Sequence, residues 1–179
     1  MNDWPTWITD FDLHLLAQGT HERCCEKLGA HLVEFGGISG VFFAVIAPNA
    51  RAVSVIGDFN GWDPARNPMK CRPEAGVWEC FVPGVQQGAL YKFWIESRVH
   101  DYRCAKADPF AFYAEVRPGT ASRVWNLEGY TWGDSEWMER RRSKRWTEQP
   151  IATYEVHLGS WLRLPEEGNR WLTYRELAD

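Results

Sequence analysis

The feature that most constrains the fold is a series of short apolar segments between residues 40 and 126. They recur about every 10–15 residues, separated by Gly, Pro and Asn, which is typical of strands joined by tight turns. The segment LYKFWIES alternates clearly, with Tyr91, Phe93 and Ile95 on one face and Lys92 and Trp94 on the other. The expected strands are residues 40–47, 52–59, 76–83, 90–97 and 121–126.

This pattern predicts a mainly β fold, an immunoglobulin-like antiparallel β-sandwich over residues 36–130. No helical segments alternate with these strands, which argues against a parallel α/β sheet. We expect the core to contain Phe43, Val55, Phe81 and Phe93. Residues 1–35 are expected to be a separate head segment, with short helices ending before Gly19 and Gly29.

The segment after the sandwich has a different character. Residues 131–150 contain helix formers and a basic run, which predicts a solvated linker helix ending before Pro150. Residues 151–161, IATYEVHLGSW, are expected to form a new buried strand and a loop. Thr173 followed by Glu176 is a capping box, which predicts that another helix begins there. Residues 151–179 therefore look like the opening βα step of a larger structure.

Composition excludes several classes of function. The net charge of −4 does not favour a nucleic-acid partner. No stretch of 18 apolar residues predicts a membrane span, and no signal peptide is apparent. The five cysteines contain no C-x-x-C pair, so we expect reduced thiols in a cytoplasmic protein, with neither metal nor cofactor. The 11 tryptophans suit either a β-rich core or a surface that stacks on sugar rings.

The segment GDFNGWD, residues 57–63, leaves a predicted strand and enters a turn. Its glycines permit backbone angles that other residues resist. The side chains of Asp58 and Asn60 can hydrogen-bond to the turn backbone. We expect Phe59 to point inward as an anchor, and Trp62 to lie on the turn, where a large ring is less easily buried.

Several segments, in this order and spacing, resemble the glycogen branching enzymes (1,4-α-glucan branching enzymes). They are GVFFAVIAPNARAVSVIGDFNGWDPARNPM (40–69), GVWECFVPG (76–84), LYKFWI (90–95), KADPFAFYAEVRPGTASRVW (106–125), YEVHLGSW (154–161) and WLTYRELAD (171–179). GDFNGWD is shared with other glucan-active proteins, whereas YEVHLGSW is more specific. The resemblance covers nearly the whole chain from Gly19 onward.

The resemblance implies a carbohydrate-binding β-sandwich module followed, over residues 151–179, by the first βα step of an α-amylase-type (β/α)8 barrel. Such a barrel needs about 250 residues, so the resemblance also implies that it is truncated in this chain. Such enzymes cleave an α-1,4 bond of a glucan and transfer the freed segment to a 6-hydroxyl, using one carboxylate as nucleophile and another as acid/base. In the family both carboxylates lie on later barrel strands, beyond the equivalent of Asp179. We therefore assign no catalytic residue within this chain and expect it to be inactive alone, without the missing catalytic barrel as partner.

The resemblance also implies two glucan contacts, because relatives with this module use a Trp in the turn motif and a Lys in the Y-K-F strand. The matching residues are Trp62 and Lys92. A third contact, a Trp after that strand, falls near Val99 and is absent. The alternatives are that Trp62 packs within the turn or between domains, and that Lys92 is a solvated strand residue.

Three hypotheses for the function follow. The first is the non-catalytic N-terminal portion of a glycogen branching enzyme, which binds α-glucan, supports the barrel, or does both. The second is a stand-alone glucan-binding module, and the third is a purely structural interaction module. YEVHLGSW and TYRELAD favour the first, because a self-sufficient module has no use for the beginning of a barrel.

Overall fold

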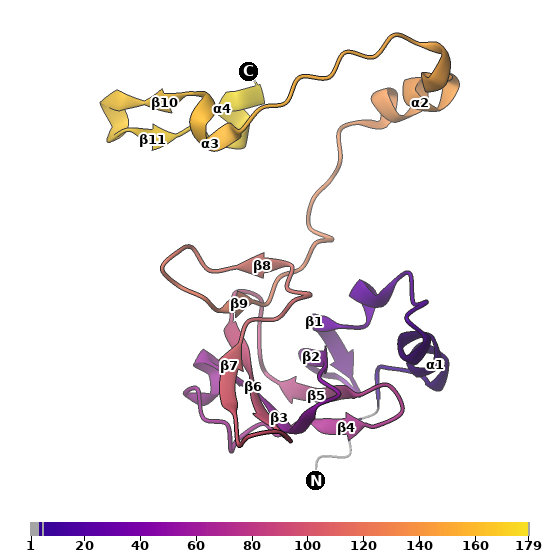
Figure 1. The fold of residues 1–179 in the computed structure, drawn as a ribbon, viewed down its shortest axis with the longest axis vertical. Helices are drawn as coiled ribbons and strands as arrows, with labels where there is room; N and C mark the ends of the chain where they lie inside the picture. Colours follow the sequence, from indigo (N-terminus) through magenta and orange to yellow (C-terminus); the bar gives the residue numbers. More distant parts are fainter. Residues whose placement is uncertain (1–3, 5, 179) are drawn as a thin grey trace. The chain divides into compact units, whose positions relative to one another are not determined.

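A computed structural model of the chain describes Trp4 and residues 6–178. The chain divides into two compact units, residues 1–131 and residues 132–179, which we describe separately (Figure 1). Among the described residues, no helix combines the length and the apolar character needed to cross a lipid bilayer.

The first unit is built on two antiparallel sheets (Figure 1). The first sheet has the order β1-β2-β5-β4, with β1 at Gly29–Phe35, β2 at Ile38–Ile46, β5 at Val77–Pro83 and β4 at Lys70–Arg72. The second has the order β3-β6-β9-β8, with β3 at Ala50–Gly57, β6 at Leu90–Ser97, β9 at Ser122–Arg123 and β8 at Tyr113–Ala114. In addition, β7 at Arg103–Lys106 pairs with β6. Four of the expected strands are confirmed to within two residues at each end, and the fifth is shortened to β9.

A single apolar core joins the two sheets. Val41, Phe43 and Val45 of β2 pack with Val55 of β3 and Phe93 of β6, all nearly inaccessible to solvent. Their alternation follows from the period of two along a strand, which sends every second side chain to the same face. The mainly β, antiparallel character is thus confirmed, and the packing of both sheets on one core is consistent with the expected β-sandwich.

The first sheet is covered on its other face as well. Phe42, Val77 and Phe81 point away from the inter-sheet core and pack with Ile8 and Leu13 of the N-terminal segment. Burial on both faces explains why β2 is a continuous apolar run and not an alternating one. The expectation that Phe81 belongs to the sandwich core is therefore corrected. Phe81 is buried, but in this second cluster, because it lies an odd number of residues from Trp78, which faces the inter-sheet core.

The head segment is shorter than expected and is tied to the sheet. Helix α1 spans Asp10–Gln18 and ends at Gly19, as predicted. The expected second helix is reduced to a 3-10 turn, η1, at Cys24–Glu26. Strand β1 begins at Gly29, so residues 29–35 form part of the first sheet, with Ala30 facing the core. The physical reason is that β2 offers β1 a complete hydrogen-bonding partner, from Gly29 opposite Ala44 to Phe35 opposite Ile38.

Two polar clusters hold the head in place. The buried Glu79 accepts hydrogen bonds from Thr6 Oγ1 at 2.7 and 2.9 Å and from Arg72 Nη1 at 3.2 Å. The buried Asp12 forms the α1 capping box with Thr9. Asp12 also binds His21 Nε2 at 3.0 Å and Lys27 Nζ at 3.1 Å.

The second unit is small and open. It contains α2 at Ser135–Ser143, η3 at Trp146–Glu148, α3 at Leu158–Trp161, β10 at Arg163–Leu164, η4 at Pro165–Glu167, β11 at Arg170–Trp171 and α4 at Tyr174–Ala178. The helix predicted within residues 131–150 is confirmed as α2, and none of its side chains is buried. The predicted capping box is confirmed too, since the Thr173 amide donates to Glu176 Oε2 at 2.8 Å and Thr173 Oγ1 accepts from the Glu176 amide at 3.3 Å.

The expected strand over residues 151–161 is not formed. Residues 151–157 have no regular secondary structure, and residues 158–161 are the short helix α3. A strand needs a neighbour to take up its backbone hydrogen bonds, and among the described residues no segment pairs with 151–157. The side chains of Ile151 and Tyr154 are accordingly exposed.

Candidate functional site

The turn that carries Trp62 is organised by one buried side chain. Asn60, only 5% exposed, accepts a hydrogen bond from the Gly57 amide at 2.9 Å. Its Nδ2 donates to the Val55 carbonyl at 3.0 Å and to Asn67 Oδ1 at 2.8 Å. Asn60 thus ties the end of β3 to the start of the turn and to the segment that returns along the strand.

Further contacts fix the same turn from both sides. Asp58 Oδ2 accepts from the Leu90 amide at 3.1 Å, which attaches the 3-10 turn η2 (Asp58–Asn60) to β6. Phe59 packs on the inter-sheet core, its ring 5.9 Å from that of Phe43, as the sequence predicted. The turn is therefore a rigid extension of the sandwich.

Trp62 lies at the outer end of this turn. Its amide donates to the Gly57 carbonyl at 2.8 Å, and its backbone is in the left-handed region at φ 61°. A bulky residue rarely adopts this conformation, so it is held there by the surrounding contacts. The side chain is 39% exposed, which agrees with the expectation that the ring is not buried. A rigid aromatic ring, partly open to solvent, is suited to stacking on an apolar face of a ligand.

Lys92 lies at the same end of the second sheet. It is opposite Ile56 in β3, one residue before the pair formed by Gly57 and Tyr91. Its neighbours Tyr91 and Phe93 face the core, so Lys92 points outward. Its Nζ donates to Thr120 Oγ1 at 2.6 Å, and an ammonium group has two further protons to offer. Lys92 and the turn that carries Trp62 thus lie at the same end of the β3–β6 pair, which is one corner of the sandwich.

A buried hydrogen-bond network joins β6 to Asp108 and to Ser122 of β9. Tyr91 donates its hydroxyl proton to Asp108 Oδ2 at 2.6 Å. Asp108 Oδ1 accepts from the Phe110 amide at 2.8 Å, and the Asp108 amide donates to Ser122 Oγ at 2.8 Å. Burial raises the pKa of Asp108, and burial together with the nearby carboxyl raises the pKa of Tyr91. The Asp108-Pro109 segment therefore fixes the direction of the chain, the structural role expected for it.

Sequence reasoning missed two polar residues of this corner. Thr120 fixes Lys92, and Asn67 completes the bonds of Asn60. Thr120 gives no local signal because it is 28 residues from Lys92 along the chain. Asn67 follows Asn60 by seven residues within a Pro- and Asn-containing turn, which is a weak signal.

Among the described residues, the cysteines and the potential metal-ligating side chains do not form a site. All five cysteines are free thiols. Over Trp4 and residues 6–178, no three His, Cys, Asp or Glu side chains come together as a metal-binding group. His157, Glu155 and Trp161 lie exposed in the second unit, where His157 Nδ1 and Ser160 Oγ are 2.8 Å apart.

Part of the first unit is similar to a known protein family. The family Carbohydrate-binding module 48 (Isoamylase N-terminal domain) matches residues 27–111. Its start, two residues before β1, agrees with the structural boundary of the sheet. Among solved structures, apo pullulanase from Klebsiella pneumoniae aligns with 56% of this chain and 11% of its own, at a TM-score of 0.47 and 24% identity.

Curated relatives match the chain almost from end to end. The 1,4-alpha-glucan branching enzyme of Paramagnetospirillum magneticum is 52% identical over 98% of this chain, which is 24% of that protein. The corresponding enzyme of Gloeobacter violaceus is 51% identical over 96% of this chain and 24% of its own. That of Aquifex aeolicus is 49% identical over 96% of this chain and 27% of its own. The chain spans about a quarter of the length of these relatives. The chain thus contains a match to carbohydrate-binding module 48 and is similar, over nearly its whole length, to about a quarter of the sequence of these 1,4-alpha-glucan branching enzymes.

Proposed function

We propose that this chain is the non-catalytic N-terminal part of a glycogen branching enzyme, an enzyme that transfers an α-1,4-glucan segment to a 6-hydroxyl. The observation that carries the proposal is the identity of 52% over 98% of the chain, which extends from the sandwich through the second unit. A module used by unrelated enzymes would not require this match over residues 132–179.

The role of the first unit is to hold α-glucan at the corner formed by Trp62 and Lys92. Trp62 offers a ring face for a sugar, and Lys92 offers donors for its hydroxyls. The rigid attachment of the turn through Asn60 supports this role, because a fixed ring loses little conformational freedom on binding.

The role of residues 151–179 is to begin the catalytic barrel. The exposed apolar side chains of the second unit support it, among them Ile151, Tyr154, Trp161, Leu162 and Trp171. Apolar side chains of this size that are left exposed are available for another part of a protein to pack against. We place the protein in the cytoplasm, since its free thiols suit a reducing compartment.

Activity is tested with the chain itself. Retaining transfer needs two carboxylates about 5–5.5 Å apart in a cleft that holds the donor chain. We expect the purified 179-residue chain to form no α-1,6 branches when it is incubated with amylose. The measurement is digestion of the product with a debranching enzyme, followed by analysis of released short chains. Release above a mock-purified control would place the catalytic residues in this chain and contradict the assignment.

Binding is tested by calorimetry with maltoheptaose. One or two stacked rings contribute a few kcal/mol, so we expect a dissociation constant on the order of high micromolar to millimolar. Trp62→Ala should weaken binding strongly, whereas Trp171→Ala, an exposed Trp of the second unit, should not. Unchanged binding in Trp62→Ala would remove Trp62 from the site.

A further inference from the structure

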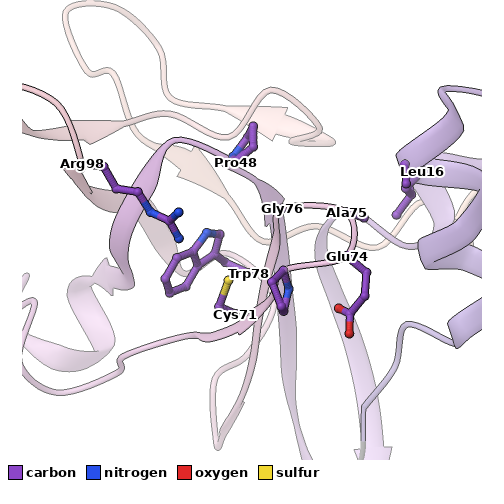
Figure 2. Close-up of a pocket in the computed structure, with 10 residues that line it drawn as sticks. Leu16, Pro48, Cys71, Glu74, Ala75, Gly76, Trp78 and Arg98 are labelled. Atoms are coloured by element: carbon purple, nitrogen blue, oxygen red, sulfur yellow. The ribbon is translucent and has the colours of Figure 1, made fainter.

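A hollow of about 330 Å³ lies at the end of the sandwich far from Trp62. Its walls come from the β2–β3 turn at Pro48, the β4–β5 turn at residues 73–76, and Leu16 of α1. Trp78, Cys71 and Arg98 complete the lining (Figure 2). Strand β3 begins at Ala50 beside Pro48 and ends at Gly57, so seven residues, or roughly 20 Å, separate the two ends. The hollow is therefore distinct from the corner that carries Trp62.

The walls of the hollow are held together by close backbone contacts. The Ala47 amide donates to the Gly76 carbonyl at 2.8 Å, and Trp78 Nε1 donates to the Ala47 carbonyl at 3.0 Å. Gly76 has φ 63°, and a Cβ added there would lie 2.6 Å from Pro48 Cβ. Only glycine allows the two turns to approach this closely. The shape is thus pre-formed, as it is in most small-molecule sites.

Arg98 presents an oriented guanidinium to the hollow. Its backbone amide donates to the Asn49 carbonyl at 3.0 Å, and its Nε donates to the Ala50 carbonyl at 3.0 Å. No described residue accepts a hydrogen bond from its two Nη atoms. Figure 2 shows Arg98 on one side of Trp78 and Glu74 on the other. Glu74 is exposed and makes no hydrogen bond or ion pair with a described residue.

The pairing of one guanidinium with one carboxylate selects a class of ligand. A phosphate or a sulfate would be attracted by Arg98 and repelled by Glu74. A sugar hydroxyl both donates and accepts, so neighbouring hydroxyls satisfy the two groups together. The accessible apolar edges of Pro48 and Leu16 suit the C–H faces of a pyranose ring.

We propose that this hollow is a second carbohydrate site, in which Arg98 and Glu74 bind hydroxyls of a short α-glucan segment. The proposal rests on the glucan-binding function proposed above. It adds a second contact at the opposite end of the module, so that one glucan particle or long chain can be held at two points.

The test is a titration of the ¹⁵N-labelled chain with maltoheptaose, followed by NMR. Amides of Ala75 and Gly76 report on the hollow, and those of Gly61 and Trp62 report on the corner. We expect saturable shifts at Ala75 and Gly76 with maltoheptaose, and none with inorganic phosphate or with the β-linked cellohexaose. Arg98→Ala should raise the dissociation constant measured there at least about tenfold, the loss expected for hydrogen bonds to a charged group.

Three variants separate the possible outcomes. Glu74→Gln should weaken the maltoheptaose binding reported by the Ala75 and Gly76 amides. It should not affect folding, because Glu74 makes no hydrogen bond or ion pair with a described residue. Arg140→Ala, on the exposed helix α2, is the matched control and should change nothing. Arg98→Ala loses the hydrogen bond from Arg98 Nε to the Ala50 carbonyl, so circular dichroism is used to check that this variant is folded.

The proposal and the proposed function fail in different ways. Shifts confined to Gly61 and Trp62 would overturn the second site and leave the glucan-binding function standing. Shifts at Ala75 and Gly76 that persist in Trp62→Ala support the second site even if the corner is inactive. Saturation of the hollow by phosphate, or the absence of any shift with maltoheptaose, would overturn it.

Discussion

The two units of this chain are stabilised in different ways. The first encloses two clusters of buried apolar side chains, one on each face of the first sheet. In the second, no described side chain is buried. Its contacts are exposed polar ones, such as the Arg170 guanidinium bound to Glu167 at 2.6 Å and to Glu176 at 2.8 and 2.9 Å. Exposed ion pairs contribute little to stability, so the two units should respond very differently to substitution.

The difference shows that richness in aromatic residues does not by itself make a core. Trp78 is buried in the first unit, where two sheets close over it. Trp137, Trp146, Trp161 and Trp171 of the second unit are each about half exposed, since no sheet or helix covers them. Several instead lie beside cations, as Trp171 does with Arg163 at 5.4 Å. Apolar burial requires a second layer, and the second unit offers none.

The largest expected effect on stability comes from removing an aromatic ring from the core. Phe93→Ala should lower the free energy of unfolding of the first unit by about 3–5 kcal/mol, because it leaves a cavity between the sheets. This is a large part of the total of about 5–15 kcal/mol typical of a domain. Urea unfolding followed by far-ultraviolet circular dichroism measures it. The matched control is Trp171→Ala, for which we expect a change below about 0.5 kcal/mol. Equal losses would mean that the second unit also has a core.

A smaller effect on stability is expected when a side chain that makes hydrogen bonds is removed. Asn60→Ala removes a buried side chain that makes three hydrogen bonds and should cost about 1–3 kcal/mol. Thr173→Ala removes an exposed helix cap in the second unit and should leave the unfolding midpoint of the first unit unchanged. Its effect should instead appear as faster amide hydrogen exchange at Glu176. A midpoint for Asn60→Ala equal to that of the unaltered chain would show that the turn is not tied to the sandwich.

The smallest effect is a pH dependence of the head. Burial raises the pKa of Asp12, but hydrogen bonds from Thr9, His21 and Lys27 outweigh it and hold the pKa well below its usual range. A carboxyl with a lowered pKa stabilises the fold above its unfolded-state pKa of about 4, and this stabilisation is lost as the pH falls below that value. Asp12→Asn should therefore be less stable than the unaltered chain at pH 7. The difference in thermal midpoint between the unaltered chain and Asp12→Asn should therefore narrow as the pH falls below about 5, because the carboxylate is then progressively protonated.

The control for this pH dependence lies in the second unit. Hydrogen bonds from Arg170 and Thr173 likewise lower the pKa of Glu176, but that carboxylate is exposed at the surface. Glu176→Gln should leave the thermal midpoint of the first unit unchanged at every pH. If the thermal midpoints of the unaltered chain and of Asp12→Asn differ by the same amount at every pH, the paired Asp12 carboxylate does not stabilise the fold.

Part of the candidate site could be predicted from local sequence. Gly57, Asn60 and Gly61 mark a tight turn directly after a strand, and a Trp in such a turn is hard to bury. The contact between Lys92 and Thr120, and the hollow beside Arg98, join segments distant along the chain. No pattern within a single segment predicts contacts between segments so far apart in the sequence. The glucan contacts of Trp62 and Lys92 stay predictions until binding is measured.

Sequence alone determined the strands at β2, β3, β5 and β6, the end of α1 at Gly19 and the cap at Thr173, because each depends on a local period or a local hydrogen bond. Tertiary structure alone decided that Phe81 packs beneath the head and that residues 29–35 join the first sheet. It also decided that residues 151–157, although strand-like in sequence, form no strand. These outcomes depend on which segment covers a face or pairs with an edge. A strand gains its hydrogen bonds from a neighbour, and an apolar face gains its burial from a covering layer, and neither is encoded within the segment itself.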